Sequence, residues 1–127
     1  MEHVVVDFKK KRVYLSSSKP DKLMCFTTKG ELTFDLSFDY PITSLDLDPE
    51  GNVIVCSGMV SAGKLFQVSP YTGKIMKHVG LETRAPRLVC FNRKGTDFFV
   101  IPNGKEAKIE KYRYNKLMDE DLFNEDE

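Results

Sequence analysis

The fold is most clearly indicated by residues 42–56, which read Ile42-Thr43-Ser44-Leu45-Asp46-Leu47, then Asp48-Pro49-Glu50-Gly51-Asn52, then Val53-Ile54-Val55-Cys56. The first and last of these segments are short apolar runs with β-branched residues, which favour strands. Between them, proline presets φ at the second turn position, and glycine accepts the positive φ that ends the turn. The stretch therefore predicts a β-hairpin whose turn depends on Gly51.

The same pattern occurs twice more in the chain. Residues 4–15 and 87–101 each hold two apolar runs, joined by Lys9-Lys10-Lys11 and by Asn92-Arg93-Lys94-Gly95. We take Phe8, Leu47 and Phe91 as the matching positions of the three hairpins, 39 and 44 residues apart. Gly95, like Gly51, is expected to have a positive φ.

Further apolar runs complete a longer repeat. A third run follows each hairpin, at 23–26, 64–68 and 108–112, and a fourth closes the first two repeats, at 32–36 and 75–79. A period of about 40 residues with four strands is typical of a β-propeller blade. The sequence therefore predicts an all-β fold of consecutive four-stranded antiparallel blades, about two and three-quarter blades with eleven strands.

The expected organisation is one repeat domain, residues 1–116, and a short acidic tail, residues 117–127. The blades are expected at about 4–36, 42–79 and 87–114. Such an open set of blades leaves two apolar faces uncovered, and the third blade lacks its outer strand.

Two segments carry a family resemblance. Residues 42–52, followed by Val68-Ser69-Pro70-Tyr71-Thr72-Gly73-Lys74, resemble a WD40 repeat, although Val68 and Ser69 stand where that family usually has Trp-Asp. The first repeat is similar to an NHL repeat. The resemblance covers residues 4–114 and implies a propeller that binds other proteins, whereas some NHL propellers bind RNA.

Composition restricts the function classes. Hydrophobic residues make up 41% of the 127 and charged residues 30%, as in a globular domain. No apolar run is long enough for a membrane span, and the N-terminus lacks a signal-peptide pattern, so we expect an intracellular protein, cytoplasmic or nuclear, with no membrane partner. Cys25, Cys56 and Cys90 have no metal-ligand spacing and are expected to be reduced, buried core thiols.

The catalytic and ligand-binding motifs in this sequence are incomplete, so we expect neither enzyme activity nor a cofactor. Residues 58–64 fit a P-loop spacing, but Leu65 replaces the required Ser or Thr and a strand follows instead of a helix. Residues 16–19 offer Ser and Lys without a nucleophile-elbow setting. A lactonase-type propeller hydrolase would need further metal ligands beside Asp7 and Asp46.

The sequence thus favours a non-catalytic scaffold that binds other proteins, the rest of its own propeller, or a second copy as a homo-oligomer. We expect binding on the face formed by the loops at 17–22, 58–63 and 102–106 and the between-blade loops at 37–41 and 80–86. The candidate contact residues, chosen because Tyr, Met and Arg are enriched at interfaces, are Tyr40, Met59, Arg84 and Arg87.

RNA binding is the alternative, because the charge is unevenly spread. Residues 1–116 hold all 19 basic residues and 13 of the 19 acidic ones, so the body carries +6 and the tail −6. Lys9-Lys10-Lys11-Arg12 is the densest basic run. This run is typical either of a nuclear-localisation or nucleic-acid-binding patch or of a solvated hairpin turn.

Overall fold

A computed structural model describes residues 3–59, 62–81, 86–92, 94–102 and 108–114. The described residues form eleven strands: β1 His3–Asp7, β2 Arg12–Ser17, β3 Lys22–Thr27, β4 Leu32–Ser37, β5 Ile42–Leu47, β6 Val53–Met59, β7 Ala62–Val68, β8 Ile75–Leu81, β9 Pro86–Phe91, β10 Asp97–Pro102 and β11 Glu110–Arg113. These strands confirm the all-β prediction. No helix in the described part of the chain is long and apolar enough to cross a membrane.

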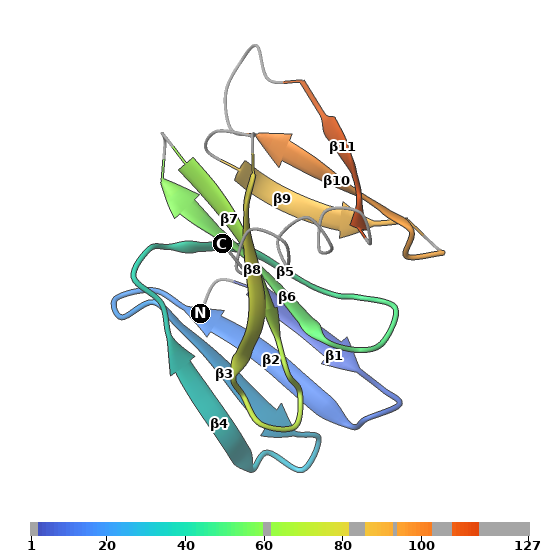
Figure 1. Ribbon diagram of the computed structural model, residues 1–127. Helices are drawn as coiled ribbons and strands as arrows, with labels where there is room; N and C mark the ends of the chain where they lie inside the picture. The colour runs from blue at the N-terminus through green and yellow to red at the C-terminus, as the bar shows by residue number, and fades with distance from the viewer. Residues whose placement is uncertain (1–2, 60–61, 82–85, 93, 103–107, 115–127) are drawn as a thin grey trace.

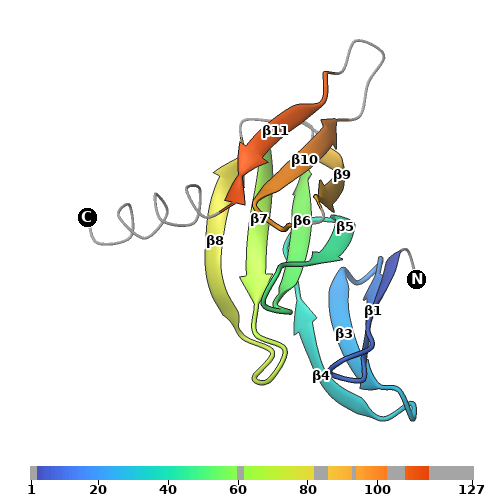
Figure 2. The ribbon, with the colours of Figure 1, turned by 90° about the vertical axis from the view of Figure 1, so that its right-hand side faces the viewer.

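The strands form three antiparallel sheets, ordered β1-β2-β3-β4, β5-β6-β7-β8 and β11-β10-β9. We call them blades 1, 2 and 3. They follow one another through the molecule, blue, green and orange in Figure 1, and Figure 2 shows the same succession from the side. The first strand of blade 2, β5, contacts the first strands of both neighbours, β1 and β9.

The first hairpin of each blade turns as the sequence predicts, with one correction. Gly51 and Gly95 have φ of 83° and 73°, which confirms the expected positive values. In the first hairpin of blade 1 the residue with positive φ is Lys11, at 56°. Phe8 lies in this turn and not in β1, and its side chain is 84% exposed. The residue that matches Leu47 is therefore Val6, because Val6 pairs with Val13 as Leu47 pairs with Val53.

Apolar side chains pack between successive sheets and form two cores. One core joins blades 1 and 2 and is centred on Tyr14, Leu23, Val53 and Val55. The other joins blades 2 and 3 and is centred on Ile54, Leu65, Phe98 and Val100. Alternate residues of β6 thus face opposite neighbours, so blade 2 is apolar on both faces, which the run Val53-Ile54-Val55-Cys56 made visible in the sequence.

Candidate functional site

The face of a blade that meets the preceding blade has a repeated pattern. On blade 2, Val53 pairs with Leu47 and Val68, and Val55 pairs with Leu45 and Phe66. Cross-strand partners lie on the same face of a sheet. All six side chains belong to the core between blades 1 and 2: Leu45, Leu47, Val53, Val55, Phe66 and Val68.

Blade 1 has the same pattern on the face that points away from blade 2. Val13 pairs with Val6 and Phe26, and Leu15 pairs with Val4 and Met24. These six residues define the blade 1 open face: Val4, Val6, Val13, Leu15, Met24 and Phe26. Val4 is 57% exposed, and the other five are half-buried. The blade 1 open face thus matches, position by position, the face of blade 2 that packs against blade 1.

The far side of blade 3 is the second uncovered face. Phe99 pairs with Cys90 and Lys111, and Ile101 pairs with Leu88. These five residues define the blade 3 open face: Leu88, Cys90, Phe99, Ile101 and Lys111. Leu88 is 41% exposed, and Phe99 and Ile101 are half-buried. The matching face of blade 2 carries Ile54 and Cys56, which are buried against blade 3.

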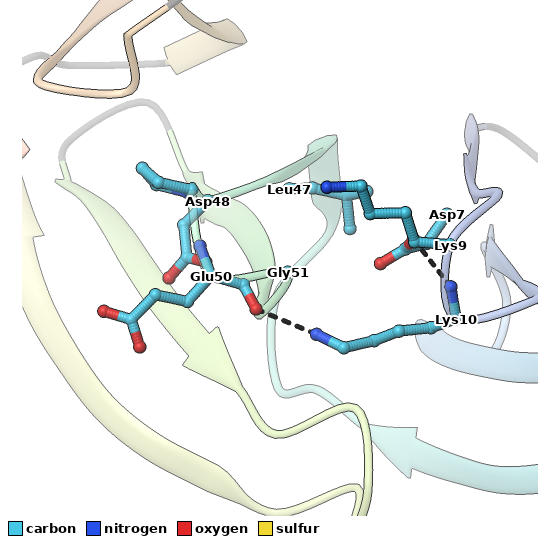
Figure 3. A pocket seen from close by; sticks show the side chains of 8 residues that line it. Asp7, Lys9, Lys10, Leu47, Asp48, Glu50 and Gly51 are labelled. Atoms are coloured by element: carbon cyan, nitrogen blue, oxygen red, sulfur yellow. Dashed lines mark hydrogen bonds between the residues drawn. The ribbon is translucent and has the colours of Figure 1, made fainter.

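A groove of about 400 Å³ lies between the first hairpins of blades 1 and 2 (Figure 3). Lys10 crosses it: its Nζ donates to the carbonyl oxygen of Glu50 at 2.8 Å and lies 5.5 Å from the ring centre of Tyr71. Asp7, at the end of β1, accepts a hydrogen bond from the Lys10 backbone N–H at 3.1 Å. Lys10 therefore links blade 1 to the first turn of blade 2.

A buried polar network joins blades 2 and 3. Asp48 Oδ2 accepts hydrogen bonds from Tyr114 Oη at 2.7 Å and from Gln67 Nε2 at 3.1 Å. Gln67 Nε2 also donates to Tyr114 Oη at 2.8 Å. Burial, and then the hydrogen bond to Asp48, raise the pKa of the Tyr114 hydroxyl well above its usual value, so it remains a donor at neutral pH.

Side chains of β5 also satisfy the backbone of β9. Ser44 Oγ accepts a hydrogen bond from the Val89 N–H, and Asp46 Oδ2 accepts one from the Phe91 N–H, both at 3.1 Å. Asp46 is thus explained as a link between blades. No group of three or more His, Cys, Asp or Glu side chains within the described ranges is placed to hold a metal ion.

Two solved structures that match this chain are propeller domains. The Dos1 propeller is 14% identical with a TM-score of 0.60, and the match covers 84% of this chain and 28% of that one. The C-terminal WD40 domain of Sif2 is 19% identical with a TM-score of 0.61, over 88% of this chain and 30% of that one. This chain has the fold of part of a WD40-type propeller.

Other comparisons agree on the fold and add no family. A protein of unknown function from Bacteroides caccae is 18% identical with a TM-score of 0.57, and 88% of this chain covers 45% of it. No protein-family model and no curated protein sequence matches the chain. The partial propeller thus spans less than half the length of these solved chains.

Two of the four candidate contact residues have described side chains. Tyr40 lies between blades 1 and 2 and is 49% exposed, and Arg87 is exposed in β9. Met59 ends β6, but its side chain lies outside the described part, as does all of Arg84. The loop expected at 58–63 is shorter than predicted, because β6 runs to Met59 and β7 starts at Ala62.

The cysteine prediction is correct for two residues and wrong for the third. Cys25 and Cys56 are buried, and burial raises the pKa of the Cys25 thiol above its usual value and that of Cys56 to about 11. Cys90 is exposed. Its strand is apolar as expected, but alternation along β9 places Cys90 on the blade 3 open face, which no described sheet covers.

We therefore expect one fast and two slow thiols in the native, dilute chain. An aromatic disulfide reagent at neutral pH should label Cys90 rapidly, since the reactive species is the thiolate and access controls the rate. Cys25 and Cys56 should react only on unfolding. The Cys90→Ser variant should lose the fast phase, whereas a fast phase that persists in this variant would contradict the assignment.

Proposed function

We propose that this chain is a non-catalytic protein-interaction module of the propeller type. The observation that carries the proposal is the blade 1 open face, where six neighbouring side chains are all apolar and none is covered by a described sheet. Continuous, partly exposed apolar surface of this kind marks protein contact sites, because burying the rest of it is favourable.

The loop face supports the proposal as a second contact area. Ser57 Oγ donates to the carbonyl oxygens of Tyr40 and Pro41, at 3.1 and 2.9 Å, and the Gly58 N–H donates to Pro41 at 3.3 Å. These bonds hold the loop that presents Tyr40. A rigid, half-exposed tyrosine contributes contact area with little loss of conformational entropy.

A protein partner is favoured over RNA by how the basic run is used. Lys10 is committed to Glu50 and Tyr71 within the fold, and Arg12 Nη1 lies 3.4 Å from two backbone carbonyl oxygens. Lys9 and Lys11 are exposed. Phosphate recognition would depend mainly on such exposed cations, so the affinity for RNA would fall steeply as the salt concentration rises. The affinity of contacts to the apolar faces would not fall in this way.

The test is quantitative affinity recovery of tagged chains from cells of the source organism, with and without nuclease. Leu15→Glu on the blade 1 open face should lose bound proteins, and Tyr40→Ala should lose a subset. The matched control is Met76→Glu, because Met76 is exposed in β8 of blade 2, which carries neither open face. Recovery that is unchanged in Leu15→Glu, or that depends on nucleic acid, would overturn the proposal.

A further inference from the structure

We propose that the open faces bind a second copy of this chain head-to-tail, with the blade 3 open face of one copy packing on the blade 1 open face of the other. This inference rests on the proposed function, because it assigns a partner to the same apolar surface. It follows from the repeat, because the two junctions within the chain show which face of a blade packs against which face of the next blade.

Both existing junctions in the chain join the same two kinds of face. At the first, Tyr14 of blade 1 meets the blade 2 face built around Val53 and Val55. At the second, Ile54 of blade 2 meets the blade 3 face built around Phe98 and Val100. Tyr14, Ile54 and Phe99 occupy matching positions, because each is the residue next to the corresponding Val13, Val53 or Phe98 on the second strand.

The two open faces therefore complete this series. Phe99 and Ile101 extend the row formed by Tyr14 and Ile54, and Val13 and Leu15 extend the row formed by Val53 and Val55. The blade 3 open face is thus of the kind that packs against a following blade, and the blade 1 open face is of the kind that packs against a preceding blade. A second copy is thus a fitting occupant of each open face.

Two such contacts form together if the pair closes. A head-to-tail contact is heterologous, so it closes into a ring when the rotation between copies is right. Two copies would then use both faces of each chain, as in a propeller of six blades, within the range of roughly four to eight known for closed propellers. Closure would also cover Leu88 and Cys90.

The first hairpins give the contact an unusual salt dependence. Lys10 of blade 1 reaches the first turn of blade 2 at Glu50. Lys94 precedes Gly95 as Lys10 precedes Lys11, so in the pair Lys94 would approach the basic turn of the second copy. Like charges at a solvent-exposed edge weaken association modestly, and salt screens them.

Sedimentation equilibrium of the full chain tests the inference. We expect a dimer that forms with rising concentration, and an association constant that increases about two- to fivefold from low to moderate salt or in the Lys94→Glu variant. Leu15→Glu and Leu88→Glu should each weaken association at least about tenfold, whereas Met76→Glu, in β8 of blade 2, should not. A chain that stays monomeric at all concentrations would overturn the inference.

Mixing the variants tests the head-to-tail arrangement. Leu15→Glu keeps its blade 3 open face and Leu88→Glu keeps its blade 1 open face, so together they should form one junction that neither forms alone. A dimer that persists in Leu88→Glu alone would instead indicate contact between two blade 1 open faces and contradict the arrangement. If either variant fails to fold, Cys90 labelling decides: its rate in the natural chain should fall as concentration rises, and a constant rate counts against the pair.

The outcome is separable from that of the proposed function. If the chain is monomeric but Leu15→Glu still loses bound proteins, the open face binds another protein and only the second copy is wrong. If Leu15→Glu affects neither association nor recovery, both proposals fail.

Discussion

Gly95→Ala should lower the free energy of unfolding by about 2–4 kcal/mol, whereas Gly30→Ala should lower it by only about 1 kcal/mol. Both glycines have positive φ, 73° and 93°, so both substitutions strain the backbone. A Cβ at Gly95 would also overlap the ring of Pro49 in the first turn of blade 2, whereas a Cβ at Gly30 meets no atom within 4 Å. The difference between the two variants thus measures how tightly consecutive turns pack.

Urea denaturation of both variants at low protein concentration gives the comparison. A double-mutant cycle identifies the cause, because Pro49→Ala removes the ring atoms that a Cβ at Gly95 would meet. In the Pro49→Ala background, Gly95→Ala should be less destabilising, with a coupling energy of about 1–2 kcal/mol. Equal losses at Gly30 and Gly95, with no coupling to Pro49, would show that only φ strain matters.

This packing explains a difference among the three first turns. Lys11 has a positive φ without being glycine, and it occupies the blade that has no described blade before it. Gly51 and Gly95 each have a neighbouring turn against them, through Lys10 and Pro49. A side chain at this position is therefore compatible with a first turn that no described turn packs against.

The strands could be predicted because their signals are local. Alternating apolar residues set the faces, and Asp-Pro-Glu-Gly or Asn-Arg-Lys-Gly set the turns, whatever packs above the sheet. Whether another sheet covers a given face depends instead on residues that are distant in the sequence. Cys25 and Cys90 both lie in apolar runs, but among the described sheets one packs against Cys25 and none packs against Cys90, so the sequence alone did not distinguish them.

The polar links between blades were also not predicted, because their partners are distant in sequence. Lys10 and Glu50 are 40 residues apart, and Asp48 and Tyr114 are 66 apart. From the sequence pattern, Lys10 was only one member of a basic run, and Asp48 was an ordinary turn residue. A signal was present for Asp48, since an Asx residue that starts a turn has its carboxylate held in place. The partner on the next blade was not visible.

Asp48→Ala should be among the most destabilising polar substitutions in the chain, with a loss of about 3–5 kcal/mol. Asp48 Oδ1 accepts hydrogen bonds from the backbone N–H groups of Glu50 and Asn52, at 2.9 and 2.8 Å. Asp48 Oδ2 accepts three more, from Asn52 Nδ2, Gln67 Nε2 and Tyr114 Oη. The side chain is buried, so alanine leaves donors without an acceptor in a region of low dielectric.

Three further variants separate the network from the charge. Asp48→Asn keeps one carboxamide oxygen and should lose less than Asp48→Ala, because the turn can retain its two backbone bonds. Asp35→Ala is the matched control, since Asp35 is an exposed carboxylate whose ion pair with Lys22 spans 3.7 Å, and it should change the free energy of unfolding by less than about 1 kcal/mol.

Tyr114→Phe should reproduce part of the Asp48→Ala loss, and in the Asp48→Ala background it should add little, because the two residues share one hydrogen bond. Additive losses at Asp48 and Tyr114 would contradict a single network between blades 2 and 3.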